Sequence, residues 1–186
     1  MPAFVTQNTY CAALEKRGYT KLGGGIYSEV YAKGNSDRVI KVGRAGDSWP
    51  DYIEWATING YAGKFAPKVY SLKFHDLFYV AVMERLVVTI DQLNAACHSS
   101  NANPFYEQYR AAKYWAGYAF GAPMEGCKDL MAFCNALGSS GYATDLHGGN
   151  MMIRYDGQIV VTDPSSKGSG NYSIRIRRGS VTNASN

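Results

Sequence analysis

Three side chains near the end of the chain have the types and the spacing needed for metal-assisted chemistry. They are the carboxylates Asp145 and Asp163 and the amide Asn150. A carboxylate and an amide oxygen can share a hard cation such as Mg²⁺, which takes few protein ligands and keeps water or phosphate in its other positions. A further carboxylate beside a metal-bound phosphate indicates phosphoryl transfer.

A β-hairpin is expected to bring two of these residues together. An Asp-Gly pair at 156–157 separates the apolar runs 151–153 and 159–161, and this pattern predicts a two-residue turn between antiparallel strands. Asn150 and Asp163 lie equally far from the centre of that turn, so they would face each other with Cβ atoms roughly 4.5–5.5 Å apart. Asp145 precedes the first strand and can reach the same end of the hairpin.

The 186-residue chain has the composition of a globular protein, with 46% apolar and 18% charged residues. Its length suits one domain, or one domain made of two small lobes. No apolar run is long enough for a membrane span and no signal-like start is present, so no membrane partner is expected. A net charge of +4 is too weak to indicate direct nucleic-acid binding. The four cysteines lack zinc-like or C-x-x-C spacing, and we interpret them as reduced, mostly buried thiols of a cytoplasmic protein.

Apolar periodicity and turn signals predict a sheet-rich N-terminal part and a helical C-terminal part. In the first, one helix precedes an antiparallel sheet and a second helix interrupts it; in the second, three helices precede the hairpin. The predicted helices cover residues 9–17, 48–60, 91–97, 104–120 and 125–137, and the predicted sheet strands cover residues 19–22, 29–32, 38–42, 68–74 and 78–83.

A glycine-rich segment separates the first two predicted strands. It contains Gly23, Gly24 and Gly25, followed by Ser28 and Val30. Glycines allow backbone N–H groups to approach a phosphate closely, because no Cβ stands in the way. The alternative is a plain Gly-rich hairpin turn, since such glycine motifs often occur by chance.

Lys41 follows this segment on a predicted strand. Side chains alternate along a strand, so Lys41 points away from the side of Ile40 and Val42 and could neutralise phosphate charge. The alternative is a solvated lysine on an outer face. Glu54, in the second predicted helix, is a candidate ion-pair partner for Lys41, and Asp51 is the other candidate. Glu54 could equally be an ordinary exposed glutamate.

His147 lies in the short loop between Asp145 and Asn150. It could donate a hydrogen bond to a transferred phosphate, or it could simply bond to the local backbone. A metal-ligand role is disfavoured, because His75 and His98 have no metal-site spacing to it.

Taken in order, these motifs resemble those of the protein-kinase superfamily. The glycine-rich segment is similar to G-x-G-x-x-[GS]-x-V, residues 39–41 are similar to the V-A-I-K strand, and residues 145–150 match D-x-x-x-x-N. Asp163 takes the place of the Asp in D-F-G. The resemblance implies ATP and Mg²⁺ as cofactors, with Lys41 on the α- and β-phosphates, and with Asn150 and Asp163 on the metal.

The resemblance also implies roles for the neighbouring residues. Asp145 would orient the acceptor hydroxyl and take its proton, while His147 would steady the γ-phosphate. Met83, Glu84 and Leu86 lie in a segment that resembles the linker between kinase lobes. Met83 would then flank the adenine, and the backbone of Glu84 and Leu86 would bind the base.

The fold implied is α+β and kinase-like, in a single domain over residues 1–186. Its N-lobe, at about residues 1–84, would be an antiparallel sheet, and its C-lobe, at about 87–186, would be a reduced helical lobe.

Within the superfamily, residues 38–43, 145–150 and 162–164 resemble most closely the early serine/threonine protein kinases of T-seven-like bacteriophages. The resemblance implies an ATP-dependent serine/threonine kinase that phosphorylates host proteins in the bacterial cytoplasm. Two alternatives remain open. One is a catalytically silent kinase-like module that binds and inhibits a host protein. The other is a small-molecule phosphotransferase, because the loop from Asp145 also resembles aminoglycoside kinases.

The sequence departs from the usual kinase pattern in three places. Thr144 stands where many kinases have an arginine, Pro164 replaces the Phe of D-F-G, and too few residues follow Asp163 for the usual peptide-docking base. Acceptor recognition would then come from the helix at 104–120 or from a second copy of the chain in a homo-oligomer.

Overall fold

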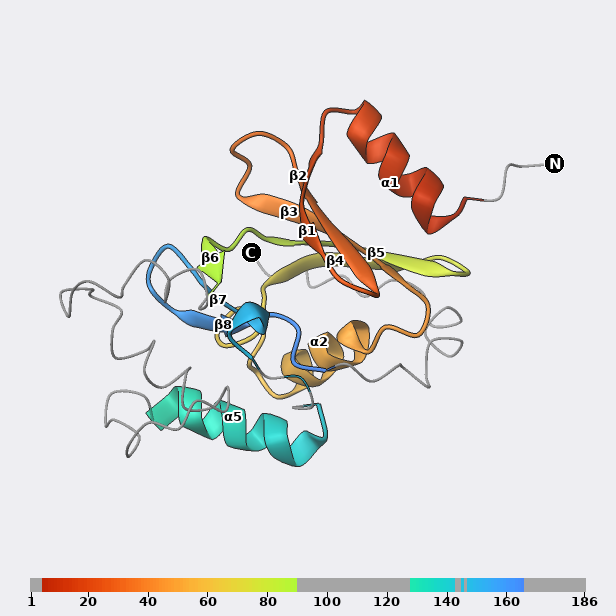
Figure 1. The fold of residues 1–186 in the computed structure, drawn as a ribbon. Helices are drawn as coiled ribbons and strands as arrows, with labels where there is room; N and C mark the ends of the chain where they lie inside the picture. The colour runs from red at the N-terminus through yellow and green to blue at the C-terminus, as the bar shows by residue number, and fades with distance from the viewer. Residues whose placement is uncertain (1–4, 90–127, 143–144, 146, 166–186) are drawn as a thin grey trace. The chain divides into compact units, whose positions relative to one another are not determined.

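The computed structural model describes residues 5–89, 128–142, 145 and 147–165 (Figure 1). The chain divides into two compact units. Of the described residues, those in Met1–Ser48 and Lys68–Arg85 form the first, called here the sheet unit. Those in Trp49–Pro67 and Leu86–Lys167 form the second, called the hairpin unit.

The sheet unit is one helix on one antiparallel sheet. A capping box between Thr6 and Thr9 starts the helix, because each side chain accepts a hydrogen bond from the other residue's backbone N–H. The strands lie in the order β1-β2-β3-β5-β4. The elements are α1 (Gln7–Lys16), β1 (Thr20–Gly24), β2 (Ser28–Ala32), β3 (Arg38–Arg44), β4 (Val69–Phe74) and β5 (Phe78–Glu84).

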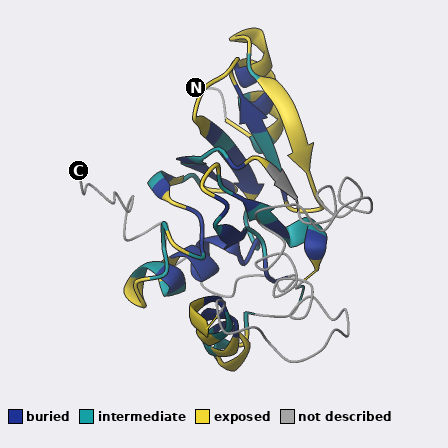
Figure 2. Cartoon of the chain, turned by 90° about the vertical axis from the view of Figure 1, so that its left-hand side faces the viewer, coloured by how far each residue is buried: buried dark blue, intermediate teal, exposed yellow. Residues whose placement is uncertain are grey.

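Helix α1 covers one face of this sheet. Its buried residues Cys11 and Leu14 pack with Val42 of β3 and Phe78 of β5 in one apolar core, and Ile40 lies against the same core. Strands β3 and β5 are largely buried, whereas β1 is exposed along its whole length (Figure 2). The alternation of β3 therefore places Lys41 on the face opposite α1 and opposite Ile40 and Val42, and this separation from its two neighbours is the one that the sequence predicts.

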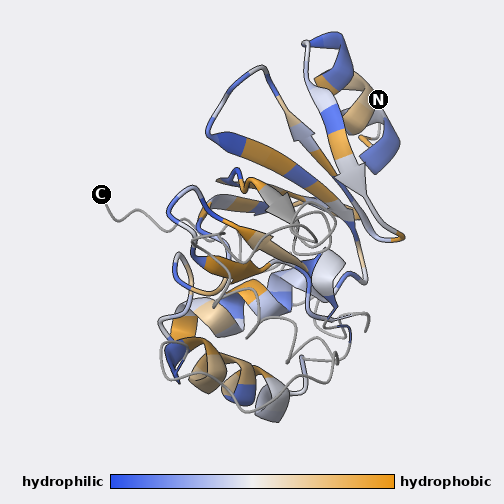
Figure 3. Cartoon of the chain, turned by 60° about the vertical axis from the view of Figure 1, so that its left-hand side comes forward, coloured by the Kyte–Doolittle hydropathy of each residue, from blue (hydrophilic) through white to orange (hydrophobic). Residues whose placement is uncertain are grey.

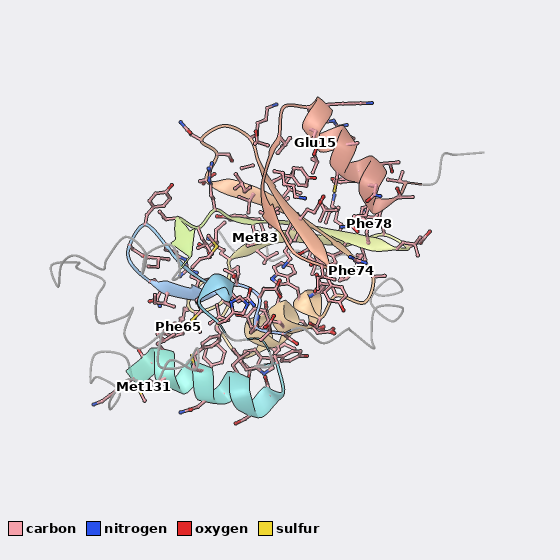
Figure 4. The ribbon with its side chains drawn as sticks, in the orientation of Figure 1. Glu15, Phe65, Phe74, Phe78, Met83 and Met131 are labelled. Atoms are coloured by element: carbon pink, nitrogen blue, oxygen red, sulfur yellow. The ribbon has the colours of Figure 1, made fainter. Side chains whose placement is uncertain are left out.

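The hairpin unit combines helices with a small three-stranded antiparallel sheet in the order β6-β7-β8. Trp55 of α2 and Phe133 of α5 lie in one aromatic cluster, with ring centroids 6.1 Å apart. Phe65 stacks on Phe133 at 5.5 Å (Figure 4). Helix α5 is made of both hydrophobic and hydrophilic residues (Figure 3), and its buried residues are Leu130, Phe133, Cys134 and Leu137. The elements are α2 (Trp49–Ile58), β6 (Val88–Thr89), α5 (Lys128–Ser140), the 3₁₀ turn η2 (Gly148–Asn150), β7 (Met151–Ile153) and β8 (Ile159–Val161).

The fold is α+β with an antiparallel five-stranded sheet, as predicted. The predicted helices at 91–97 and 104–120 lie outside the described residues, as do Cys97 and Cys127. Cys11 and Cys134 are buried free thiols, as predicted. None of the helices in the described segments is both long and apolar enough to cross a bilayer.

The predicted register of the β7–β8 hairpin is wrong by one residue. Met151 pairs with Val161 and Ile153 with Ile159. The turn is not the two-residue type: Arg154 N–H donates to the Gln158 carbonyl (3.0 Å), which leaves three residues in the loop. Gly157 is the last of them, with φ of 85°, so the Asp-Gly pair forms the end of a three-residue loop with a glycine bulge.

Candidate functional site

Asn150 is joined directly to Asp145. Its amide nitrogen donates to the backbone carbonyl of Asp145 at 2.9 Å and lies 3.3 Å from the Asp145 carboxylate oxygen Oδ2. An amide group has its donor and its acceptor on opposite sides, so these bonds turn the Asn150 oxygen away from Asp145. That oxygen is the atom of Asn150 suited to a cation.

Asp163 is held next to this pair from both sides along the chain. The residue before it, Thr162, bonds to the Asn150 carbonyl through its backbone N–H (2.8 Å) and its hydroxyl (2.9 Å). The residue after it, Pro164, accepts a hydrogen bond from the Asp145 backbone N–H at 2.9 Å. The structure thus brings Asp145, Asn150 and Asp163 together although Asn150 is joined to Thr162 rather than to Asp163.

The donor set fits a hard cation that also binds phosphate. Carboxylate and amide oxygens are the ligands that Mg²⁺ accepts, and Mg²⁺ commonly takes one or two protein ligands with substrate phosphates beside them. Among the described residues there is no group of three or more His, Cys, Asp or Glu side chains that could hold a metal by itself. A cation at Asn150 and Asp163 would therefore complete its shell with nucleotide oxygens or water.

His147 caps the short turn that carries Asn150. Its Nδ1 accepts a hydrogen bond from the Gly149 backbone N–H at 3.1 Å, so the local backbone bond considered from the sequence is present. Its Nε2 then carries the proton and lies 3.8 Å from Asp145 Oδ1, beyond hydrogen-bond distance. Both side chains are about half exposed, at 50% and 45%, so the same imidazole can cap the turn and present an N–H to a ligand.

Lys41 lies at the centre of the sheet face that α1 does not cover. It stands between Val30 of β2 and Ala81 of β5, and Met83 of β5 is opposite Val39. Only 5% of Lys41 is exposed, so the alternative of a solvated lysine is wrong. A buried ammonium requires compensating polar or anionic groups, which suits a residue that binds phosphate.

The glycine-rich segment forms the tight β1–β2 hairpin, in which Gly25 N–H donates to the Ser28 carbonyl at 2.9 Å. A Cβ on Gly24 would lie 2.9 Å from that carbonyl oxygen, so the hairpin itself requires glycine there. At Gly23 and Gly25 a Cβ would meet nothing within 4 Å, and neither residue has a positive φ. Neither backbone strain nor crowding requires glycine at these two positions, so a ligand can approach the backbone there without meeting a Cβ.

The sequence analysis missed an ion pair at the base of this hairpin. Lys21 and Glu29 form a salt bridge across β1 and β2, and the Tyr31 hydroxyl donates to the second oxygen of Glu29 at 2.8 Å. The bond from Lys21, followed by that from Tyr31, lowers the pKa of Glu29 below its usual value. The pair fixes the two strands from which the glycine-rich turn projects; oppositely charged residues on adjacent strands were the available signal.

The segment predicted to bind adenine is partly occupied by other backbone bonds. Glu84 N–H donates to the Lys68 carbonyl at 3.0 Å, and the Glu84 carboxylate accepts from Lys68 N–H at 2.7 Å. The backbone N–H of Glu84 is therefore already used within the sheet unit. Met83 and Leu86 are buried, at 6% and 8% exposure.

The two candidate partners of Lys41 differ in exposure. Glu54 is exposed on α2, whereas Asp51, in the first turn of the same helix, is only 8% exposed. A carboxylate leaves water only where other groups compensate it, so burial favours Asp51 over Glu54. The pairing with Lys41 itself stays a prediction.

Comparison with known protein families gives a match over most of the chain. Residues 4–175 match the family described as bacteriophage T7 protein kinase 0.7. The matched segment includes every residue discussed in this subsection. No curated protein matches the chain.

Proposed function

Because the chain belongs to the bacteriophage T7 protein kinase family, we propose that it transfers the γ-phosphate of ATP to serine or threonine side chains of host proteins in the bacterial cytoplasm. The observation that carries this proposal is the joined set of Asp145, Asn150 and Asp163. Asn150 bonds directly to Asp145, and the neighbours of Asp163 bond to both.

The hairpin unit would supply the metal and acceptor groups. Asn150 and Asp163 would hold Mg²⁺, which neutralises phosphate charge when bound. The Asp145 carboxylate would accept a hydrogen bond from the acceptor hydroxyl and take its proton as the new O–P bond forms and the bond from the γ-phosphorus to the bridging oxygen breaks, releasing ADP. His147 would donate a hydrogen bond from its Nε2–H group to an oxygen of the γ-phosphate, which is consistent with the tautomer that its Nδ1 bond selects.

The sheet unit would supply the nucleotide-binding groups. Lys41 would bind the α- and β-phosphates, and its burial on the face opposite α1 supports this role. The absence of side chains at Gly23 and Gly25 would let the phosphates come close to the backbone of this hairpin. Met83 lies on the face of Lys41 and would pack against the adenine. Such a site acts by positioning and charge stabilisation, without a covalent nucleophile.

The test is Asp145→Asn, assayed with labelled ATP, Mg²⁺ and a lysate of the bacterial host. Loss of a general base costs about 10²–10⁴-fold in rate, so we expect transfer to proteins to fall by at least about 100-fold. Nucleotide affinity should stay within about twofold, since binding does not use this carboxylate. The matched control is Asp156→Asn in the hairpin turn, because asparagine can still accept the 3.0 Å bond from Gln158 N–H.

The same assay separates the alternatives. Label on small molecules and not on proteins would make the chain a small-molecule phosphotransferase. No label at all, with nucleotide still bound, would make it a silent module that acts by binding a host protein. Equal loss of transfer and of nucleotide affinity in Asp145→Asn would contradict the role given to Asp145.

A further inference from the structure

Two aromatic side chains at the start of α2 bond to the backbone that leads into Asp163. Trp49 donates its indole N–H to the Thr162 carbonyl at 2.8 Å. Tyr52 donates its hydroxyl to the Val161 carbonyl, also at 2.8 Å. Both side chains are almost fully buried, at 1% and 0% exposure, and the bond of Tyr52 is buried as well, which strengthens it.

The remaining backbone groups of these two residues are used as well. Val161 N–H donates to the Phe65 carbonyl in the loop after α2, and Thr162 N–H donates to the Asn150 carbonyl, each at 2.8 Å. Every backbone donor and acceptor of Val161 and Thr162 thus has a partner. Beyond them, Pro164 accepts from Asp145. Asp163 is therefore held on both sides by bonds that do not involve its own side chain.

This anchoring compensates for a weak local element. Strand β8 has only three residues and belongs to a sheet of three short strands, which by itself fixes the following backbone poorly. The hydroxyl of Tyr52 stays a donor, because burial raises its pKa well above the usual value.

We propose that Trp49 and Tyr52 are positioning residues for Asp163, setting the place of its carboxylate for a divalent cation bound with the nucleotide. The inference rests on the proposed function, since it assigns Asp163 to that cation. Helix α2 and the Asp163 backbone would then move as one body, and the metal-binding geometry would be assembled without a separate activating event.

The test removes single hydrogen bonds and measures metal-dependent binding. In Tyr52→Phe the ring and its packing stay, and only the hydroxyl is lost. The probe is Mn²⁺ with a non-hydrolysable ATP analogue, titrated by calorimetry with and without the metal. One hydrogen bond is worth about 1 kcal/mol, and tenfold in affinity is about 1.4 kcal/mol, so we expect the metal-dependent gain in affinity to fall roughly fivefold. Affinity for the metal-free analogue should not change.

Two further variants make the test specific. Trp49→Phe removes the second bond and should lower the same quantity, which keeps the test decisive if Tyr52→Phe does not fold. Tyr61→Phe is the matched control: its ring stacks on Trp55 at 5.5 Å in the same unit, and its hydroxyl has no hydrogen-bond partner among the described residues. Its metal-dependent affinity should equal that of the unaltered protein.

The outcomes distinguish the inference from the proposed function. If the folded Tyr52→Phe and Trp49→Phe variants lose stability but keep the full metal-dependent gain, the two residues are merely structural and the inference is overturned. If the unaltered protein binds no nucleotide with metal, the proposed function fails and the inference fails with it.

Discussion

Gly43 offers a sharp test of how the sheet face around Lys41 is built. It lies two residues after Lys41 on the same strand, opposite Tyr79 of β5. The Tyr79 ring crosses directly over Gly43, and its hydroxyl donates to the buried Asp47 carboxylate at 2.5 Å. A Cβ at position 43 would overlap the atoms of that ring. Gly43→Ala must therefore displace the ring and disturb its bond to Asp47.

The expected cost follows from these two effects. Forcing an extra methyl group into a packed core costs about 1–3 kcal/mol. Loss of a hydrogen bond to a charged group costs about 1.5–3 kcal/mol. The free energy of unfolding should therefore fall by about 2.5–6 kcal/mol. For a chain of this size, each kcal/mol corresponds to about 2–4 °C in Tm.

Chemical denaturation of Gly43→Ala and of Gly23→Ala measures the effect. Gly23 is the matched control, since it lies in β1 of the same sheet and a Cβ there meets nothing within 4 Å. In a Tyr79→Leu background the clash is gone, so Gly43→Ala should then cost less than about 1 kcal/mol. An equal cost with tyrosine and with leucine at position 79 would refute the reasoning.

Two further predictions concern ionisation and thiol chemistry. The pKa of Glu29 is lower in the folded protein than in the unfolded chain. The stability that its pair with Lys21 contributes is therefore present above about pH 4.5, and it is lost as the pH falls through the pKa of Glu29 in the folded state. In thermal melts at pH 7, Glu29→Gln should have a lower Tm than the unaltered protein, and the difference in Tm should disappear in acid. A difference in Tm that does not change with pH would contradict this assignment. Burial raises the pKa of Cys11 to about 11 and that of Cys134 to about 12. Both thiols should therefore resist alkylation at pH 8 in the folded protein and react once the protein unfolds. Mass spectrometry of the labelled peptides measures the difference. Rapid labelling of either thiol under native conditions would contradict their burial.

The main elements could be predicted because their signals are local. The alternation of Ile40, Lys41 and Val42 predicted that Lys41 lies on the other side of β3 from its two neighbours, and these two neighbours do pack together, in the core with α1. The Asp-Gly pair correctly predicted a hairpin. It did not predict the register, because Asp-Gly suits both a two-residue turn and the end of a three-residue loop.

By itself the sequence determined the family, the order of the motifs and the residue types at the candidate site. Only the tertiary structure decided how Asp163 is placed. Its neighbour Thr162 donates to Asn150 and accepts from Trp49, and its neighbour Pro164 accepts from Asp145. It also decided that Asp51 is buried and Glu54 exposed. Motif spacing and strand periodicity depend on residues that are close together in the sequence. These contacts instead join segments that are distant along the chain. No local pattern specifies which backbone carbonyl a buried tryptophan or tyrosine side chain will reach.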